Sequence, residues 1–255
     1  MQKIKKILLT VLLIFVFIPL SAKALPKTIK KEIIVETKDC RVIKATLSYI
    51  EIKNVKKYPT VLLLHSLGYS STYWGNLVQE LNDAGYAVIA MDFRGHGKSI
   101  YNTSFQKKSW IYFNEKEYQK FPGDVVLLLD KVNKQYKNLS PDNFAIVGAD
   151  IGANAAVLAA KELKIKPKTI VLISPTRDFK GLYIPVAMTD LKVPMLSIVS
   201  RKDRFCVDEE KELAKFSQSG FYSKKYPEGG TGMLMLKINP EMSQDIVKWI
   251  IKYLK

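Results

Sequence analysis

The chain has 255 residues, 47% of them hydrophobic, which is enough for one domain with a sizeable core that needs no covalent staples. Its two cysteines, Cys40 and Cys206, exclude a dense disulfide framework, and whether they pair stays open. With only two histidines and no CxxC or HExxH spacing, a zinc or haem site has almost no ligands to draw on. We therefore expect no metal and no cofactor.

The formal net charge of +16 raises the question of a polyanionic partner. Nearly all of the basic residues are lysines scattered between apolar segments, and only five are arginines (Arg41, Arg94, Arg177, Arg201 and Arg204). Proteins that read nucleic acids favour clustered arginine with interleaved aromatic residues. We therefore expect a lysine-rich solvated surface and no nucleic-acid partner.

Residues 1–24 read as a targeting segment. Three lysines fall within residues 1–6, residues 7–20 form an apolar run of 14, and Ala22-Lys23-Ala24 supplies the small-x-small pattern that signal peptidase accepts. An uncleaved membrane anchor is the alternative, although a run of 14 is shorter than the ~20 residues that cross a bilayer. We expect a signal peptide over 1–24, a mature domain over 25–255 with no stable membrane span, and export to the periplasm or the extracellular space.

Short β-type runs alternate with helix-type segments along the rest of the chain. Residues 32–36 and 42–50 alternate apolar and polar side chains, as the strands of a half-buried hairpin do. Continuous apolar runs, typical of strands covered on both faces, follow at 60–64, 87–91, 144–147, 169–173 and 195–199, and a short last strand is expected at 222–226. Helical periodicity occupies 73–84, 125–136, 152–163, 208–216 and 242–254. The sequence therefore predicts an α/β fold with a mostly parallel eight-stranded sheet and helices on both faces.

In such a sheet the chemistry belongs on loops at the carboxyl ends of the strands. His65-Ser66-Leu67-Gly68 follows one strand directly, and Asp92-Phe93-Arg94-Gly95-His96-Gly97-Lys98-Ser99 follows another. A small-residue turn such as the first leaves backbone N–H groups pointing outward. Six aromatic residues farther along either line the mouth of a cleft or pack over the sheet (Tyr101, Phe105, Trp110, Tyr112, Phe113 and Tyr118).

The most specific signal is Gly148-Ala149-Asp150-Ile151-Gly152, between a strand and a helix of small residues. A sharp strand-to-helix turn requires glycine on both sides of its apex, because strand and helix backbones approach closely there. The apex side chain, Asp150, is then presented to the cleft. A later loop offers Asp203 where an orienting acid would be needed.

These four ordered motifs resemble the α/β-hydrolase superfamily, and within it the single-domain esterase, dienelactone-hydrolase and serine-aminopeptidase-like members. The resemblance covers nearly all of the expected mature chain and implies the α/β-hydrolase fold with no large cap domain. It also implies an oxyanion hole formed by the backbone N–H groups of Leu67 and Ile151, which we expect to converge beside the apex.

Two positions depart from the family pattern. Asp150 stands where these members usually have the nucleophilic serine, and Thr231, in Glu228-Gly229-Gly230-Thr231-Gly232, stands where they have the base histidine. Threonine has no pKa near neutrality and cannot take a proton from a nucleophile or a water. Loss of the base alone costs about 10⁴ to 10⁶ in turnover in the serine-histidine-aspartate scheme. Asp150, Asp203 and Thr231 thus mark a degenerate triad, and if they face one another we expect at least one carboxyl to have a raised pKa.

Three functional hypotheses are consistent with this pattern. The first is a degenerate, weakly active or non-catalytic hydrolase homologue that binds a small ligand. The second is an active hydrolase with an unconventional site centred on Asp150. The third is an exported interaction module in which the cleft is incidental. Haloalkane dehalogenases and epoxide hydrolases do use an apex aspartate, but they have a tryptophan beside it and a helical cap, whereas this chain has Ile151 and no long insertion after 169–173.

Overall fold

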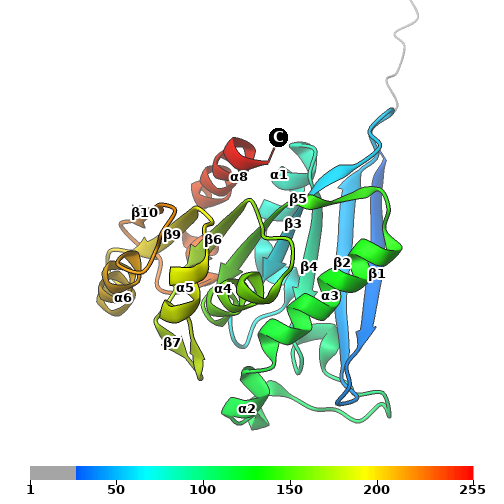
Figure 1. The fold of residues 1–255 in the computed structure, drawn as a ribbon, viewed down its shortest axis with the longest axis horizontal. Helices are drawn as coiled ribbons and strands as arrows, with labels where there is room; N and C mark the ends of the chain where they lie inside the picture. The colour runs from blue at the N-terminus through cyan, green and yellow to red at the C-terminus, as the bar shows by residue number, and fades with distance from the viewer. Residues whose placement is uncertain (1–26, 255) are drawn as a thin grey trace, which may run out of the picture.

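A computed structural model describes residues 27–254. The predicted signal segment, residues 1–24, lies outside the described residues. Within the described part of the chain, eight strands form one sheet in the order β1-β2-β4-β3-β5-β6-β9-β10 (Figure 1). Their bounds are β1 Thr28–Glu36, β2 Val42–Ile50, β3 Tyr58–Leu64, β4 Ala87–Asp92, β5 Leu139–Ala149, β6 Thr169–Ile173, β9 Met195–Ser200 and β10 Phe221–Tyr226.

The pairing of the strands follows the predicted hairpin and βα units. Strand β2 is antiparallel to both of its neighbours, β1 and β4, and every other pair in the sheet is parallel. Leu62 at the centre of β3 is in register with Ile89 on β4 and with Ile146 on β5. The predicted mostly parallel eight-stranded sheet is confirmed. Parallel order brings the carboxyl ends of β3, β4, β5 and β9 to one edge of the sheet, where the four sequence motifs begin.

The helices differ from the sequence prediction mainly near the amino terminus. Residues 73–84 were expected to form one helix, but the chain forms a 3₁₀ turn, η1 (Ser71–Trp74), and then α1 (Leu77–Asp83). The break lies at Gly75, which has a φ of 56°, a left-handed value that an α-helix cannot accommodate. The remaining helices are α2 Glu115–Tyr118, α3 Phe121–Gln135, α4 Ile151–Glu162, α5 Pro185–Asp190, α6 Arg204–Ala214, α7 Leu234–Ile238 and α8 Glu241–Tyr253.

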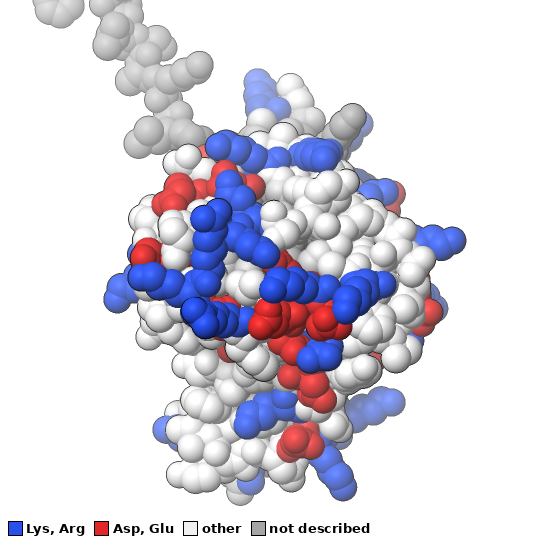
Figure 2. All heavy atoms as spheres, turned by 90° about the vertical axis from the view of Figure 1, so that its left-hand side faces the viewer, with Lys and Arg blue, Asp and Glu red and all other residues white. Residues whose placement is uncertain are grey.

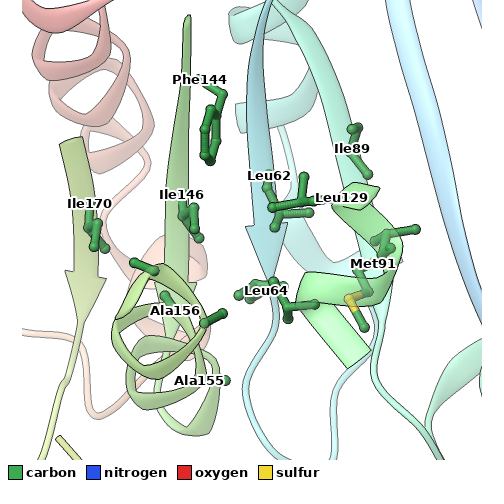
Figure 3. Close-up of a cluster of buried hydrophobic side chains, with 14 of the residues drawn as sticks. Leu62, Leu64, Ile89, Met91, Leu129, Phe144, Ile146, Ala155, Ala156 and Ile170 are labelled. Atoms are coloured by element: carbon green, nitrogen blue, oxygen red, sulfur yellow. The ribbon is translucent and has the colours of Figure 1, made fainter. Parts of the chain in front are cut away.

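Two hydrophobic clusters cover the two faces of the sheet, because successive side chains of a strand point in opposite directions. Leu62 and Leu64 of β3 pack on the face covered by α3 and α4, together with Ile146 of β5 (Figure 3). Val61 and Leu63 point to the other face, which is covered by α1 and α8. The prediction of helices on both faces is therefore confirmed, and the strands that carry the motifs are held from both sides.

No large cap covers the sheet among the described residues. The connection from β4 to α3 carries the 3₁₀ turns η2 (Gly97–Ser99) and η3 (Trp110–Tyr112) and the short α2. The connection from β6 to β9 carries a two-stranded hairpin, β7 (Asp178–Phe179) and β8 (Leu182–Tyr183), followed by α5. Both insertions are short, so the edge of the sheet where the motifs lie is bordered by loops. No helix in the described part of the chain is long and apolar enough to span a bilayer.

Lysines are conspicuous on the side of the molecule formed by α6, β10 and α8 (Figure 2). Many of them are paired with carboxylates: Lys224 lies 3.1 Å from Asp245, and Lys225 lies 3.2 Å from Glu210. Figure 2 accordingly shows acidic side chains among the basic ones. The charge on this face is mixed rather than gathered into a single basic groove.

Candidate functional site

The turn between β5 and α4 places Asp150 at its apex. Asp150 has a φ of 57° and a ψ of −121°, a strained conformation for a residue with a side chain. A Cβ added to Gly148 would lie 2.2 Å from the carbonyl oxygen of Gly152, and one added to Gly152 would lie 2.2 Å from the carbonyl oxygen of Leu64. Any larger residue at either position would therefore clash with backbone. The two glycines allow strand, turn and helix to approach closely enough to form the sharp turn that the sequence predicts.

The Asp150 carboxylate points toward backbone N–H groups of the site. Its Oδ2 accepts a hydrogen bond from the backbone N–H of Leu67 over 3.3 Å. The backbone N–H of Ile151 also donates to this carboxylate. The two N–H groups expected to form the oxyanion hole thus converge, and they converge on the apex carboxylate itself.

Burial dominates the ionisation of Asp150, which is 9% exposed. Burial raises the pKa of its carboxyl to about 7, the hydrogen bonds from Leu67 and Ile151 oppose that rise, and the nearby charge of Asp203 adds to it. The sequence led us to expect a raised pKa from repulsion between two carboxylates. The pKa is raised, but desolvation is the larger cause and repulsion the smaller one.

The loop that carries Leu67 is braced by both histidines of the chain. His65 contacts the carbonyl oxygen of Ser66 through Nδ1 at 2.8 Å, and its Nε2 accepts the N–H of Phe93 at 3.0 Å. His96 accepts the N–H of Gly68 through Nε2 at 3.2 Å, and its Nδ1 lies 3.0 Å from the carbonyl oxygen of Arg94. Since both ring nitrogens of each histidine are engaged by backbone, neither is free to act as a base for Asp150.

The same burial keeps these imidazoles neutral. Burial lowers the pKa of His65 to about 4, and that of His96 to about 3, with the proximity of His65 adding to the shift at His96. Trp110 stacks on His96 with ring centroids 5.3 Å apart, and it lies close to Gly68. Of the six aromatic residues noted in the sequence, Trp110 therefore packs over residues 65–68 (the oxyanion loop), whereas Phe105 and Tyr112 are exposed.

Asp203 is the N-cap of α6, directly before Arg204, and its carboxylate accepts hydrogen bonds from two donors. Its Oδ1 accepts the backbone N–H of Cys206 at 3.0 Å, and its Oδ2 accepts the hydroxyl of Thr231 at 2.5 Å. Although burial acts to raise the pKa of Asp203, the hydrogen bonds from Thr231 and Cys206 hold it below its usual value. Asp203 is thus an ionised cap of α6 whose second oxygen is occupied by threonine, in the place where an imidazole N–H would be expected.

The loop containing Thr231 packs directly against the turn at Asp150. A Cβ added to Gly232 would lie 3.0 Å from the Cβ of Asp150 and 2.3 Å from the Oγ of Ser66. Gly232 donates its N–H to the Oγ of Ser174 at 2.9 Å, and Met233 donates to the Oγ of Ser66 at 3.0 Å. The structure therefore brings Asp150, Asp203 and Thr231 to one site, although the Thr231 side chain is exposed.

Several residues that the structure places at this site were assigned no role there by the sequence analysis. Ser66 and Ser174 anchor the Thr231 loop, and Ser174 has a left-handed φ of 52° directly after β6. Cys206 lies 3.6 Å from the Oγ1 of Thr231, and burial raises the pKa of its thiol to about 12. Cys206 lies three residues after Asp203, which is the spacing between a helix cap and the N–H that it accepts. This spacing is the one sequence signal that could have identified Cys206 as part of the site. Cys206 and Cys40 are both free, so the question of their pairing is answered: they do not form a disulfide.

The arrangement defines a class of protein. A β5–turn–α4 unit with an acidic apex, converging N–H groups from the β3 loop, and an acid after β9 together make this an α/β-hydrolase-fold protein. Residues 56–197, more than half of the chain, match the family described as serine aminopeptidase, S33, and the chain belongs to that family. Among the described residues, no group of His, Cys, Asp and Glu side chains is arranged to hold a metal ion.

Solved structures with the same fold include several hydrolases. An acetyl xylan esterase from Paenibacillus sp. R4 superposes with a TM-score of 0.71 at 14% identity, over 92% of this chain and 86% of that one. A dienelactone hydrolase from Anabaena variabilis superposes with a TM-score of 0.64 at 18% identity, over 89% of this chain and 99% of that one. No curated protein matches the sequence. At these identities the structural likeness establishes the fold alone.

Proposed function

We propose that this chain is an exported hydrolase homologue that binds a small ligand and does not efficiently turn it over. The observation that carries the proposal is the hydrogen bond from the Leu67 N–H to Asp150 Oδ2 at 3.3 Å. In an ester or amide hydrolase, these N–H groups stabilise the negative oxygen that develops in the transition state. Here the carboxylate of the protein already accepts them.

A substrate oxygen would meet two obstacles at this site. It would have to displace Asp150 from the N–H groups, and once Asp150 is ionised it would face a like charge. Because burial raises the pKa of Asp150 to about 7, that obstacle grows as the pH rises through neutrality. The group that stabilises the transition state in an active relative would be largely blocked in this one.

Proton transfer is the second missing function. Thr231 occupies the sequence position of the base, and its hydroxyl O–H donates a hydrogen bond to the Oδ2 of Asp203. A hydroxyl with no pKa near neutrality cannot accept a proton from a nucleophile or a water. His65 and His96 are both engaged by backbone groups, so neither compensates.

One observation favours a second candidate, an active hydrolase centred on Asp150. A buried carboxyl with a pKa of about 7 is suited to exchanging a proton at neutral pH. A carboxylate can also attack an alkyl carbon, in which case a carbon–oxygen ester bond forms and the leaving group departs with the bonding electrons. Without a base to activate water, such an ester would persist as a stable adduct.

Two measurements separate these candidates. The first is a steady-state assay with the p-nitrophenyl esters of acetate, butyrate and octanoate. The second is the intact mass of the protein after exposure to an alkyl bromide and to an epoxide. We expect ester hydrolysis no faster than with Asp150→Asn, and no added mass. Sustained turnover that disappears in Asp150→Asn would overturn the proposal in favour of the second candidate. Added mass that depends on Asp150 would do the same and would identify the residue as a nucleophile.

Export is the remaining part of the proposal, and it rests on the lysines, the apolar run and Ala22-Lys23-Ala24 in the first 24 residues. Expression of the full chain in a bacterial host and amino-terminal sequencing of the fractionated product test it. We expect protein beginning at Leu25 outside the cytoplasm. Full-length protein retained in the membrane fraction would indicate an uncleaved anchor instead.

A further inference from the structure

A cavity of about 470 Å³ opens beside the oxyanion loop. Its walls come from two chain segments, residues 69–76, which follow the oxyanion loop, and residues 233–243, which follow the Thr231 loop. This volume lies within the range of about 300–1,000 Å³ that small-molecule sites occupy. The residues that give the lining its aromatic, apolar and charged character are Tyr69, Tyr73, Trp74, Met233, Leu236 and Lys237.

Both walls are anchored on Ser66, the residue before Leu67. Tyr69 donates its N–H to the carbonyl oxygen of Ser66 at 3.1 Å, and Met233 donates its N–H to the Ser66 Oγ at 3.0 Å. The cavity is therefore a neighbour of the Asp150 site, held by the same loop. It lies toward α1 and α8, because Trp74 and Met233 belong to the hydrophobic cluster on that face of the sheet.

The lining is apolar and aromatic, with a few polar groups. Tyr69 and Tyr73 meet edge to face with ring centroids 5.2 Å apart, an arrangement that presents ring surface to a flat or extended apolar group. Trp74 is 1% exposed, and its indole N–H has no hydrogen-bond partner among the described residues. The Trp74 ring belongs to the hydrophobic cluster on this face of the sheet and adds apolar surface to the lining.

Charge distinguishes the two sides of this region. Lys237 is the charged residue of the lining, it is exposed, and within residues 27–254 no carboxylate pairs with it. On the other side of Ser66 lies the turn between β5 and α4 (the elbow), with the two acidic residues Asp150 and Asp203. An anionic group would be repelled from the elbow and attracted to Lys237, so the head group of an anionic ligand has one favoured direction.

We propose that this cavity binds an apolar monocarboxylate, an aryl- or alkyl-carboxylic acid, with its carboxylate beside Lys237 and its apolar body against Tyr69, Trp74 and Leu236. The inference rests on the proposed function in that it takes the chain to bind a ligand without consuming it. It adds the place, the chemical class and the orientation of that ligand.

Calorimetric titration with 4-phenylbutyrate and with its neutral analogue 4-phenylbutan-1-ol tests the inference. We expect the acid to bind more tightly than the alcohol, and Lys237→Gln to weaken the acid about threefold to fivefold, the value of a partly exposed ion pair, while leaving the alcohol unchanged. Leu234→Trp, which replaces a leucine side chain of the cavity wall by a larger indole ring, is expected to weaken the binding of both compounds. Lys56→Gln, at an exposed lysine outside the lining, is the matched control and should change neither.

Equal binding of acid and alcohol, or an affinity for the acid that is insensitive to Lys237→Gln, would overturn the inference. So would the absence of binding by either compound. None of these outcomes alters the ester-hydrolysis assay, so the failure of this inference is distinguishable from the failure of the proposed lack of turnover. Conversely, ester turnover that depends on Asp150 would defeat the proposed function whatever the titrations show.

Discussion

The backbone N–H of Leu67 and the Oδ2 of Asp150 lie 3.3 Å apart, and this contact links the oxyanion loop to the apex of the elbow. In the family pattern, the apex residue attacks the substrate and the loop stabilises the product of that attack. In this chain the two elements bind each other. Under the proposed function, an acidic apex changes two functions at once, since it stands in place of the nucleophile and engages the N–H groups that would stabilise the oxyanion.

Replacing Asp150 by asparagine is expected to remove a pH dependence from stability. Because the folded state raises the pKa of this carboxyl from 3.8 to about 7, it holds the proton more tightly than the unfolded state does. The stabilisation from this group is complete below pH 4 and is lost as the pH rises to about 7. Asparagine does not titrate. As the pH rises from 4 to about 7, the free energy of unfolding of Asp150→Asn should therefore increase by up to about 4 kcal/mol relative to that of the natural protein.

Urea denaturation at pH 4.5, 6 and 8 measures this difference. Asp142→Asn, at an exposed carboxyl on the same strand, is the matched control for the loss of one carboxyl that is not buried. A difference between Asp150→Asn and the natural protein that stays constant across these pH values would show that the Asp150 carboxyl is not desolvated.

Thr231→Val should uncouple the Thr231 loop from α6. The change removes the hydroxyl that donates to Asp203 at 2.5 Å while preserving shape, so Asp203 loses one of the donors that hold its pKa low. We expect the pKa of Asp203 to rise and the free energy of unfolding at neutral pH to fall by about 1 kcal/mol. Carboxyl carbon shifts followed by NMR during an acid titration, together with denaturation at pH 7, provide the two readouts. Thr231→Ser keeps the hydroxyl and should behave as the natural protein does; equal effects of valine and serine would assign the role to packing instead.

The glycine at position 152 should tolerate no side chain. A Cβ there would lie 2.2 Å from the carbonyl oxygen of Leu64, so Gly152→Ala forces β3 and α4 apart and should destabilise the protein by about 3 kcal/mol. Gly123→Ala provides the matched comparison, because Gly123 lies in α3 with open space around the added atom. That change should stabilise the protein by roughly 0.5–1 kcal/mol through helix propensity. Thermal denaturation measures the melting temperatures of the two variants. A shift of both melting temperatures in the same direction would contradict the account.

The sequence was informative where the fold requires one kind of residue at a position, either for burial or for steric reasons. The apolar runs predicted the strands because strands covered on both faces need them, and Gly148 and Gly152 fixed the turn because nothing larger fits. The helix expected over 73–84 was wrong, since apolar periodicity continued through Gly75 but the backbone did not. The direction in which individual side chains point could not be predicted from the sequence either. The turn of the Asp150 carboxylate toward Leu67, and the anchoring by Ser66 and Ser174, depend on contacts between loops far apart in the chain.

The central claim, that an occupied oxyanion hole and a missing base together suppress turnover, is tested most directly by restoring both groups. Asp150→Ser empties the hole and supplies a nucleophile, and Thr231→His supplies a base whose ring N–H can take the place of the threonine hydroxyl at Asp203. The exposed position of Thr231 leaves room for the larger ring. The measurement is the steady-state rate of p-nitrophenyl acetate hydrolysis by the natural protein, the two single variants and the double variant. We expect the double variant to exceed each of the other three by about 100-fold or more, because nucleophile and base act as a unit. A natural protein as fast as the double variant, or a double variant no faster than the single ones, would contradict the account.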